Sequence, residues 1–316
     1  MNYLFFGTSD FAQVVLRGLI QANFSPTLIV TTPPKPVGRK QILTPSLVNQ
    51  LAQEFHLPVL TPVKLTDPDF IEILQNTQPE FALLTAYGKI IPPLLLTLPQ
   101  RGFVNLHPSL LPRWRGATPI QATLLAGDQE TGATLFQMDE LIDHGPILNQ
   151  SVYQITNPRL TFLELSKILA QLGIDLILKT IPLWLENKIT PRPQEESLAT
   201  FCHKITPQDE HLDWHTSAFL IDRKVRALNP QPGVYTLIQN KILKILKGFP
   251  LASSNFSQKG EIGQTFEYLS QGKKLIAVQC QTDFYVIEEL QLAGKKSLSS
   301  DQFLLGNHWF LGQILS

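Results

Sequence analysis

An amide, an imidazole and a carboxylate stand near the ends of two strand-like runs in the middle of this sequence. Asn105 and His107 lie two residues apart in the apolar run 102–107, which Pro108 ends. Because side chains alternate across a strand, both project from the same face. Asp143 lies in the acidic, glycine-bearing loop 139–146, which follows the strand-like run 133–138.

If both runs belong to one parallel sheet, their carboxyl ends meet at the edge where open α/β sheets place ligands. The three side chains would then share one site. Such a trio suits a reaction that moves a proton and stabilises a tetrahedral oxyanion. Each residue also has a structural interpretation, since a histidine beside proline is often a hydrogen-bonded structural residue and a strand-end asparagine often forms a turn.

The elements that would position these residues alternate short apolar runs with helical patterns, which is typical of a doubly wound, Rossmann-like α/β domain. The first turn lacks the G-x-G-x-x-G fingerprint, so a nicotinamide cofactor is not expected. The expected strands are 2–6, 26–31, 58–60, 81–85 and 152–155, and the expected helices are 11–19, 46–56, 68–75, 119–126 and 161–186. Four prolines and a glycine make the stretch 32–46 an exposed loop.

A polar, proline-rich stretch divides the chain. We expect a catalytic domain at 1–187, a linker at 188–206 and a second domain at 207–316. The second domain shows short alternating strands with glycine-bearing turns, at 234–238, 242–247, 274–279 and 282–291. This pattern favours a small, OB-like β-barrel.

Composition narrows the class of protein. With 43% hydrophobic and 16% charged residues, the chain is expected to be a soluble globular protein. Its 26 basic and 26 acidic residues give no overall charge, so a nucleic-acid site must be a local patch. Two cysteines, no signal-peptide pattern and no apolar stretch of membrane-spanning length favour the cytoplasm. His211 and His215 lack the glutamate of H-E-x-x-H between them, so no metal is expected.

The residues around the trio form a long, ordered signature. Asn-x-His-Pro-Ser-Leu-Leu-Pro, then Arg115-Gly116, Pro119-Ile120-Gln121 and Asp143-x-Gly145, resembles the active-site signature of the formyltetrahydrofolate-dependent formyltransferases. The whole chain is most similar to the members of that family that act on methionyl-tRNA. The resemblance implies a formyltransferase domain followed by a tRNA-holding β-barrel, and it implies catalytic roles for Asn105, His107 and Asp143.

The resemblance also assigns binding residues. It implies that the pocket for the folate co-substrate, 10-formyltetrahydrofolate, is lined by Tyr87, Gly88, Ile90, Ser109, Leu110, Leu111 and Pro112. It implies that the loop 32–46, with Gly38-Arg39, inserts against the acceptor end of tRNA, although Gln41 and Ile42 stand where the family is basic. The candidate tRNA contacts are Arg39, Lys40, Arg223, Lys244, Lys247, Lys295 and Lys296.

The expected reaction is therefore transfer of the formyl group to the α-amine of methionine on initiator tRNA, by a monomer with no membrane partner. Two alternatives stay open at this point. A formyltransferase that acts on a small amine, such as an amino sugar nucleotide, would share the trio but would not need the loop at Arg39 or a second, β-rich domain. A non-catalytic RNA-binding protein would tolerate loss of the trio, which is complete here.

Overall fold

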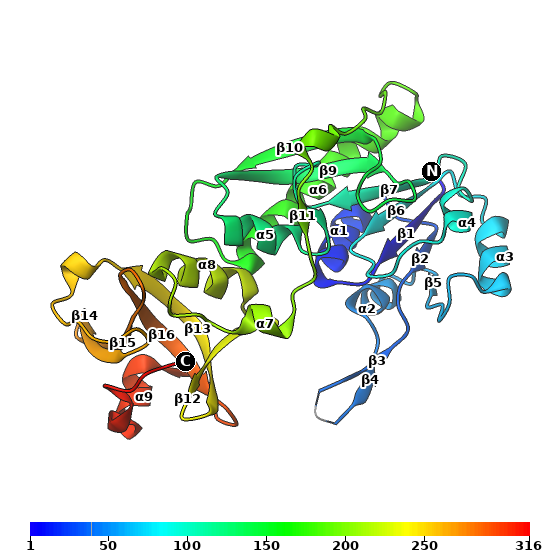
Figure 1. The fold of residues 1–316 in the computed structure, drawn as a ribbon. Helices are drawn as coiled ribbons and strands as arrows, with labels where there is room; N and C mark the ends of the chain where they lie inside the picture. The colour runs from blue at the N-terminus through cyan, green and yellow to red at the C-terminus, as the bar shows by residue number, and fades with distance from the viewer. Residues whose placement is uncertain (39) are drawn as a thin grey trace. The chain divides into compact units, whose positions relative to one another are not determined.

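The computed structural model describes residues 1–38 and 40–316, which form two compact units (Figure 1). The first unit comprises Met1–Pro119, Gln129–Thr156 and Leu163–His203. The second comprises Ile120–Asp128, Asn157–Phe162 and Lys204–Ser316. Two short segments that precede residue 187 therefore belong to the C-terminal unit, an arrangement that the expected division at 1–187, 188–206 and 207–316 does not contain.

The first unit is built on a seven-stranded sheet with the strand order β10-β9-β7-β6-β1-β2-β5. Five neighbouring strands are parallel: β5 (Val59–Leu60), β2 (Leu28–Val30), β1 (Tyr3–Gly7), β6 (Phe81–Thr85) and β7 (Phe103–His107). The other two, β9 (Glu130–Gln137) and β10 (Ile147–Gln154), are antiparallel to their neighbours. The doubly wound, Rossmann-like core predicted from the sequence is therefore present.

The sequence suggested that the strand containing Asn105 and the strand that precedes Asp143 run parallel. This expectation is wrong, because β9 pairs antiparallel with β7. Gln137, at the end of β9, lies opposite Val104 near the start of β7, while Thr134 lies opposite His107. The carboxyl ends of these two strands thus point in opposite directions. Asp143 must reach the other two side chains through its loop.

Helices cover both faces of this sheet. Phe70 and Leu74 of α3 (Pro68–Asn76) and Leu95 of α4 (Pro93–Leu96) join a core cluster with Leu4 and Leu84 on one face. On the other face Phe81 packs edge-to-face against Trp184 of α6 (Phe162–Leu185). The remaining helices of the unit are α1 (Asp10–Gln21) and α2 (Leu47–Glu54), which begin at N-caps Ser9 and Ser46.

The helix α6 is long and apolar enough, by length and composition alone, to cross a membrane. The expectation that no stretch reaches this length is therefore wrong. Half of its most apolar window is buried within the structure, and its buried residues include Leu165, Leu169 and Ile177. This burial is typical of a core helix that packs on a sheet, and such a helix can have the same length and apolar composition as a membrane-spanning one.

The proline-rich stretch 32–46 forms a hairpin of its own. Its strands, β3 (Lys35–Val37) and β4 (Ile42–Thr44), pair antiparallel in a separate two-stranded sheet. Figure 1 shows this hairpin standing away from the seven-stranded sheet. Three of its apolar side chains, Val37, Ile42 and Leu43, are more than half exposed. The stretch is thus exposed, as predicted, but it is more regular than a loop.

The segment predicted as a linker, 188–206, makes ordered contacts with the first unit up to His203. Arg192 forms a β-bridge with Ile147, through backbone hydrogen bonds of 2.7 and 2.8 Å. Further on, the strand β11 (Phe201–Cys202) pairs with β8 (Arg115–Gly116). A short 3-10 helix, η1 (Glu196–Leu198), lies in the sequence between Arg192 and β11. Much of this proline-rich segment is therefore an ordered part of the first unit, next to Arg115 and Gly116.

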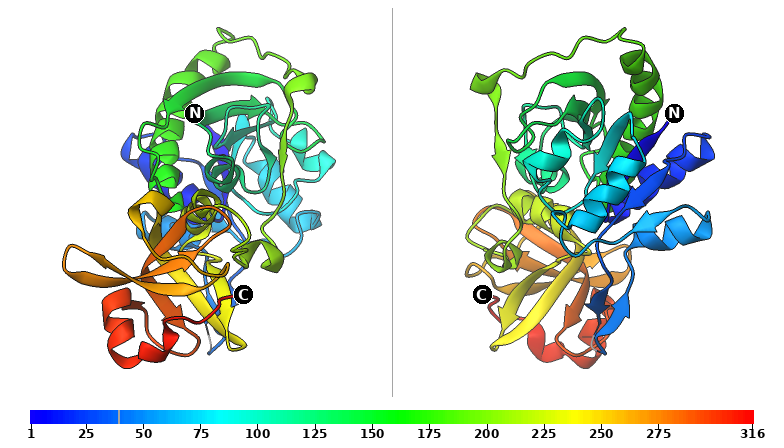
Figure 2. Two further views of the ribbon diagram at one scale, coloured as in Figure 1. Left: turned by 60° about the vertical axis from the view of Figure 1, so that its left-hand side comes forward. Right: turned by 90° about the vertical axis from the view of Figure 1, so that its right-hand side faces the viewer.

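The second unit is an antiparallel sheet with the order β12-β13-β16-β15-β14, and β17 also pairs with β16. Its helix α8 packs on β12, β13 and β16, and α9 packs on β15, β16 and β17. Figure 2 shows α9, in red, beside these strands. The strands are β12 (Val234–Ile238), β13 (Lys241–Leu251), β14 (Thr265–Ser270), β15 (Lys273–Gln279), β16 (Phe284–Leu292) and β17 (Leu298–Ser299). The helices are α5 (Pro119–Ala126, from Ile120 on), α7 (Pro207–Glu210), α8 (Ala218–Leu228), α9 (Ser300–Gly306), η2 (Ser253–Asn255) and η3 (His308–Phe310).

The C-terminal tail joins the two edges of this sheet. On one side Ser316 exchanges backbone hydrogen bonds with Leu237 of β12, at 2.7 and 3.1 Å. On the other side Thr265 of β14 donates to Gln313 and accepts from Gly312. The tail therefore bridges the two edge strands, at Leu237 of β12 and at Thr265 of β14, as expected for a small, partly open barrel.

Candidate active site

The three side chains singled out in the sequence meet in the first unit. The Nδ2 atom of Asn105 lies 3.4 Å from Oδ1 of Asp143, and Nδ1 of His107 lies 3.6 Å from Oδ2 of the same carboxylate. Asn105 and His107 project from one face of β7, while Leu106 between them packs on Gly173 of α6. All three are largely buried, with the side chain of Asp143 the most exposed at 13%. The amide, imidazole and carboxylate therefore form one cluster.

The tautomer of His107 follows from its second contact. Nε2 of its ring lies 2.8 Å from the carbonyl oxygen of Trp114. Because a carbonyl oxygen only accepts, Nε2 carries a hydrogen and donates it. Nδ1, the atom that faces Asp143, is consequently an acceptor in the neutral ring and a donor in the imidazolium. The ring can thus either take or give a proton at the side where the carboxylate lies.

Asp143 is fixed by the loop that follows β9. Its Oδ2 accepts a hydrogen bond from the backbone N–H of Gly116 at 2.8 Å. Gly145, two residues on, lies so close to Gln137 that a Cβ at this position would overlap the carbonyl oxygen of Gln137. The loop can therefore fold back tightly after β9, which is how Asp143 reaches β7 although the strands are antiparallel.

Gly116 has a similar constraint on its backbone. Its φ of +120° lies in a region that favours glycine, and a Cβ there would overlap the carbonyl oxygen of Cys202 in β11. Any larger residue would push β8 and β11 apart and would move the N–H that binds Asp143. The Arg-Gly pair of the sequence signature thus owes its glycine to this close approach.

Arg115 of the signature is held by two residues that were not assigned a role from the sequence, Gln194 and Glu196. Arg115 is only 2% exposed and makes paired hydrogen bonds to Gln194 and to Glu196. The Arg115 guanidinium lowers the pKa of the Glu196 carboxyl from its usual value. No local pattern in the sequence indicates this pairing, because about 80 residues separate Arg115 from its partners.

The candidate folate residues divide into buried and exposed groups. Ser109 and Leu111 are buried, and the Ser109 hydroxyl donates to the carbonyl oxygen of Arg113 at 2.6 Å. That bond fixes the turn next to Trp114, whose carbonyl binds His107. Leu110 and Pro112 are partly exposed, and the side chain of Ile90 is 84% exposed. Gly88, beside it, has a positive φ of 76°.

Tyr87 lies within the core. Its ring packs edge-to-face against Phe6, with the centroids 5.4 Å apart. Its hydroxyl is buried and has no hydrogen-bond partner among the residues that the structure describes. Burial also raises the pKa of Tyr87 to about 12, so the hydroxyl stays protonated at neutral pH.

Replacing Tyr87 by phenylalanine is therefore expected to stabilise the fold by up to about 1 kcal/mol, since a buried hydroxyl without a partner costs free energy. Urea unfolding of the parent and of Tyr87→Phe measures this difference. Tyr3→Phe is the matched control, because the Tyr3 hydroxyl donates to the carbonyl of Phe24 at 2.7 Å. Loss of this hydrogen bond in Tyr3→Phe should destabilise the fold. A Tyr87→Phe variant that is less stable than the parent would contradict the expectation.

The candidate tRNA contacts are spread over both units. Arg39 lies outside the described residues, and its neighbour Lys40 is exposed. Arg223 is partly buried, and its guanidinium donates to the carbonyl of Ala126 at the end of α5. Lys247 is exposed and lies 3.5 Å from Glu288. Lys244, Lys295 and Lys296 are exposed as well. The four lysines of the second unit are thus accessible, while the Arg223 side chain caps a helix.

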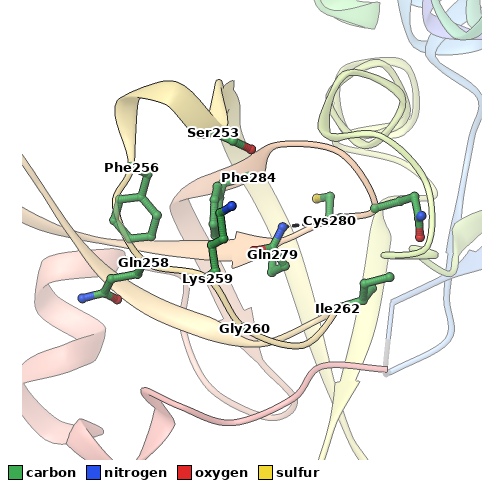
Figure 3. A pocket seen from close by; sticks show the side chains of 10 residues that line it. Ser253, Phe256, Gln258, Lys259, Gly260, Ile262, Gln279, Cys280 and Phe284 are labelled. Carbon is green, nitrogen blue, oxygen red and sulfur yellow. Dashed lines mark hydrogen bonds between the residues drawn. The ribbon is translucent and has the colours of Figure 1, made fainter.

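Two pockets in the second unit are lined by residues that the structure describes. One, with a volume of about 250 Å³, lies between the loop at Phe256–Gly260 and the strand end at Gln279–Cys280. Figure 3 shows the rings of Phe256 and Phe284 on one side of it and Cys280 on the other. The other, of about 270 Å³, is lined by Lys295, Lys296 and apolar residues of β16, β17 and α9.

Comparison with known proteins covers both units. A family model described as formyl transferase matches residues 1–181, and one described as formyl transferase, C-terminal domain, matches residues 204–308. A methionyl-tRNA formyltransferase of Nitrosomonas eutropha is 37% identical over 307 residues, which is 97% of this chain and 95% of that protein. One of Chloroflexus aurantiacus is 36% identical over 309 residues, or 98% and 97% of the two chains.

Solved structures share the fold at low sequence identity. HypX from Aquifex aeolicus, in complex with tetrahydrofolic acid, has a TM-score of 0.66 at 15% identity, over 96% of this chain and 46% of HypX. An N-formyltransferase from Helicobacter canadensis, in complex with folinic acid and dTDP-3-aminofucose, has a TM-score of 0.63 at 19% identity, over 90% and 97% of the two chains. With both units matched and relatives this similar along the full length, the chain belongs to the formyl transferase family, among its methionyl-tRNA formyltransferases.

Proposed function

We propose that this chain transfers the formyl group of 10-formyltetrahydrofolate to the α-amine of methionine on initiator methionyl-tRNA, for the initiation of translation. The observation that carries the proposal is the cluster of Asn105, His107 and Asp143 within a chain of this family. Relatives that are 36 and 37% identical over nearly the whole chain bear the name methionyl-tRNA formyltransferase.

In the first step the uncharged amine attacks the formyl carbon, and the carbonyl oxygen becomes an oxyanion. Asn105 stabilises this oxygen by donating an amide hydrogen. Its Nδ2 carries two hydrogens, so the long contact to Asp143 leaves one for the substrate. His107 in its imidazolium form donates from Nδ1, because its Nε2 hydrogen is already bound by Trp114. Two preorganised donors therefore face the developing charge.

In the second step the tetrahedral intermediate collapses. The new ammonium loses a proton to Asp143, directly or through a water, and the proton passes to N10 of the folate. The bond between the formyl carbon and N10 then breaks, the carbonyl forms again, and tetrahydrofolate leaves. Asp143 suits this role because its carboxylate lies beside both other side chains and is held by the N–H of Gly116.

The folate would lie against the segments Tyr87–Ile90 and Ser109–Pro112. In this placement the side chain of Ile90, which is 84% exposed, would cover one face of the folate ring. The tRNA would contact the hairpin around Arg39 and the exposed lysines of the second unit, Lys244, Lys247, Lys295 and Lys296. We infer a cytoplasmic location for this reaction, in agreement with the translation enzymes to which the chain is similar.

A formyl-transfer assay tests this proposal. The full chain is incubated with 10-formyltetrahydrofolate and with either charged initiator methionyl-tRNA or a small amine, such as dTDP-3-aminofucose or free methionine. We expect rapid formylation of the charged tRNA and none of the small amines. Preferred formylation of a small amine would instead assign the chain to a different substrate class within the same family.

A further inference from the structure

The main chain of the Asp143 loop is held by one side chain from the segment 188–203. The Nε2 atom of Gln194 donates to the carbonyl oxygens of Asp143 and Gly145, at 2.9 and 2.8 Å. Both hydrogens of the amide are therefore used on the loop, on either side of His144. The β-bridge of Arg192 with Ile147 fixes the backbone two residues before Gln194.

Gln194 is itself held in one orientation by Arg115. Its Oε1 accepts from Nε and Nη2 of that arginine, at 3.0 and 2.8 Å. Since Oε1 faces a cation that can only donate, the two hydrogens of Nε2 must point at the loop. Arg115 is 2% exposed, and Glu196 balances its charge through bonds of 2.6 and 2.9 Å. A series of side-chain hydrogen bonds thus runs from Glu196 through Arg115 to Gln194, and Gln194 binds the main chain of Asp143.

Asp143 requires such support because of its backbone. Its φ of +49° is left-handed, a conformation that a residue other than glycine adopts at a cost in free energy. The N–H of Gly116 holds the carboxylate, and Gln194 holds the carbonyl oxygen of the same residue. The position of the carboxylate beside Asn105 and His107 therefore depends on contacts at both ends of Asp143.

We propose that Gln194 is a positioning residue for formyl transfer, which sets the place of the Asp143 carboxylate by holding the main chain of its loop. The inference rests on the proposed role of Asp143 in the reaction. Gln194 touches neither substrate nor the reacting atoms, so its removal should act on turnover through Asp143. A displacement of about 1 Å in a reacting group can lower a rate by about 100-fold.

The substitution Gln194→Glu separates positioning from a merely structural contact. A glutamate has the same shape and still accepts from Arg115, so the segment 188–203 remains attached. It cannot donate, however, and it turns a negative oxygen toward the carbonyls of Asp143 and Gly145. If Gln194 served only to bind Arg115, this variant would keep parent activity. We expect kcat to fall about 30- to 100-fold instead, with KM for 10-formyltetrahydrofolate and for methionyl-tRNA unchanged.

A double variant tests whether the effect passes through Asp143. In the Asp143→Asn background, Gln194→Glu should cause no further loss of kcat, since residues that act as a unit are not additive. Gln154→Glu is the matched control. Gln154 also donates from Nε2, to Glu130 on the exposed side of β9 and β10, and its variant should turn over like the parent.

Three outcomes overturn the inference. Parent kcat in Gln194→Glu, with Asp143→Asn impaired, would mean that Gln194 does not position the loop, while the proposed role of Asp143 would stand. If the two losses of kcat multiplied in the double variant, Gln194 would act independently of Asp143. Parent kcat in Asp143→Asn itself would remove the role of Asp143 and, with it, this inference.

Discussion

Asn105→Ala is expected to lower kcat by about 100- to 1000-fold, which corresponds to a loss of about 2.7–4 kcal/mol of transition-state stabilisation. The expectation follows from the place of the amide, which is largely buried on β7 and within 3.4 Å of the Asp143 carboxylate. A hydrogen-bond donor in such a site needs no reorganisation when the oxyanion forms. Single-turnover kinetics with saturating 10-formyltetrahydrofolate and charged tRNA measure the effect on the chemical step.

Asn105→Asp and Asn149→Ala complete this experiment. The aspartate keeps the volume of the asparagine but removes the donor and adds a negative charge beside Asp143, so we expect a loss at least as large. Asn149 is a partly exposed asparagine of the same sheet that donates to Thr180 of α6, and its alanine variant should leave kcat unchanged. An Asn105→Ala enzyme with parent turnover would exclude the amide as the oxyanion donor.

The pairing of Asn105 with His107 could be predicted from the sequence because strand alternation is local. A run of five residues fixes which side chains share a face, and the structure places Leu106 against α6 and its two neighbours on the other side. The parallel core of the sheet was predictable for a similar reason. Alternating strands and helices leave few topologies open, and strands such as β6 match the expected residues.

The route by which Asp143 reaches the site could not be predicted from the sequence. The residues of a strand do not record whether its partner runs parallel or antiparallel, so the direction of β9 was wrong although its position was nearly right. The contacts of Gln194 were missed because a proline-rich, polar segment has the composition of a linker. What orders it is a set of partners 49 to 79 residues away, which no local pattern contains.

The barrel of the second unit shows the same limit. Its long strands were expected, but β14 and the tail that bonds to both edge strands were not. The tail has no alternating pattern of its own, and its conformation follows from the edge strands with which it pairs. Arg223 is a further case, because nothing local indicates that a basic residue on a helix will donate to the carbonyl of Ala126, 97 residues away.

Arg39→Ala is expected to lower kcat/KM for charged tRNA by about 10- to 100-fold, the range for loss of a hydrogen bond to a charged group. Arg39 lies outside the described residues, between β3 and β4 in the sequence, and among the described residues these two strands pair only with each other. The strands that flank it expose the apolar side chains of Val37, Ile42 and Leu43 together with one basic residue, Lys35 of β3. If this hairpin meets the acceptor end of tRNA, Arg39 is one of three basic residues, with Lys35 and Lys40, that supply its positive charge.

Salt dependence distinguishes a phosphate contact from a general loss of structure at Arg39. Neutralising one phosphate contributes about 0.7 to 0.9 to the slope of log affinity against log salt, so the variant should show a shallower slope than the parent. Lys259→Ala is the matched control, as this lysine lines the pocket in the second unit and is not among the expected tRNA contacts. Binding of 10-formyltetrahydrofolate should be the same in both variants, because its expected pocket is built by the segments at Tyr87 and Ser109. Equal kcat/KM of parent and Arg39→Ala on limiting charged tRNA would exclude the hairpin turn as a tRNA contact and would favour a small amine as substrate.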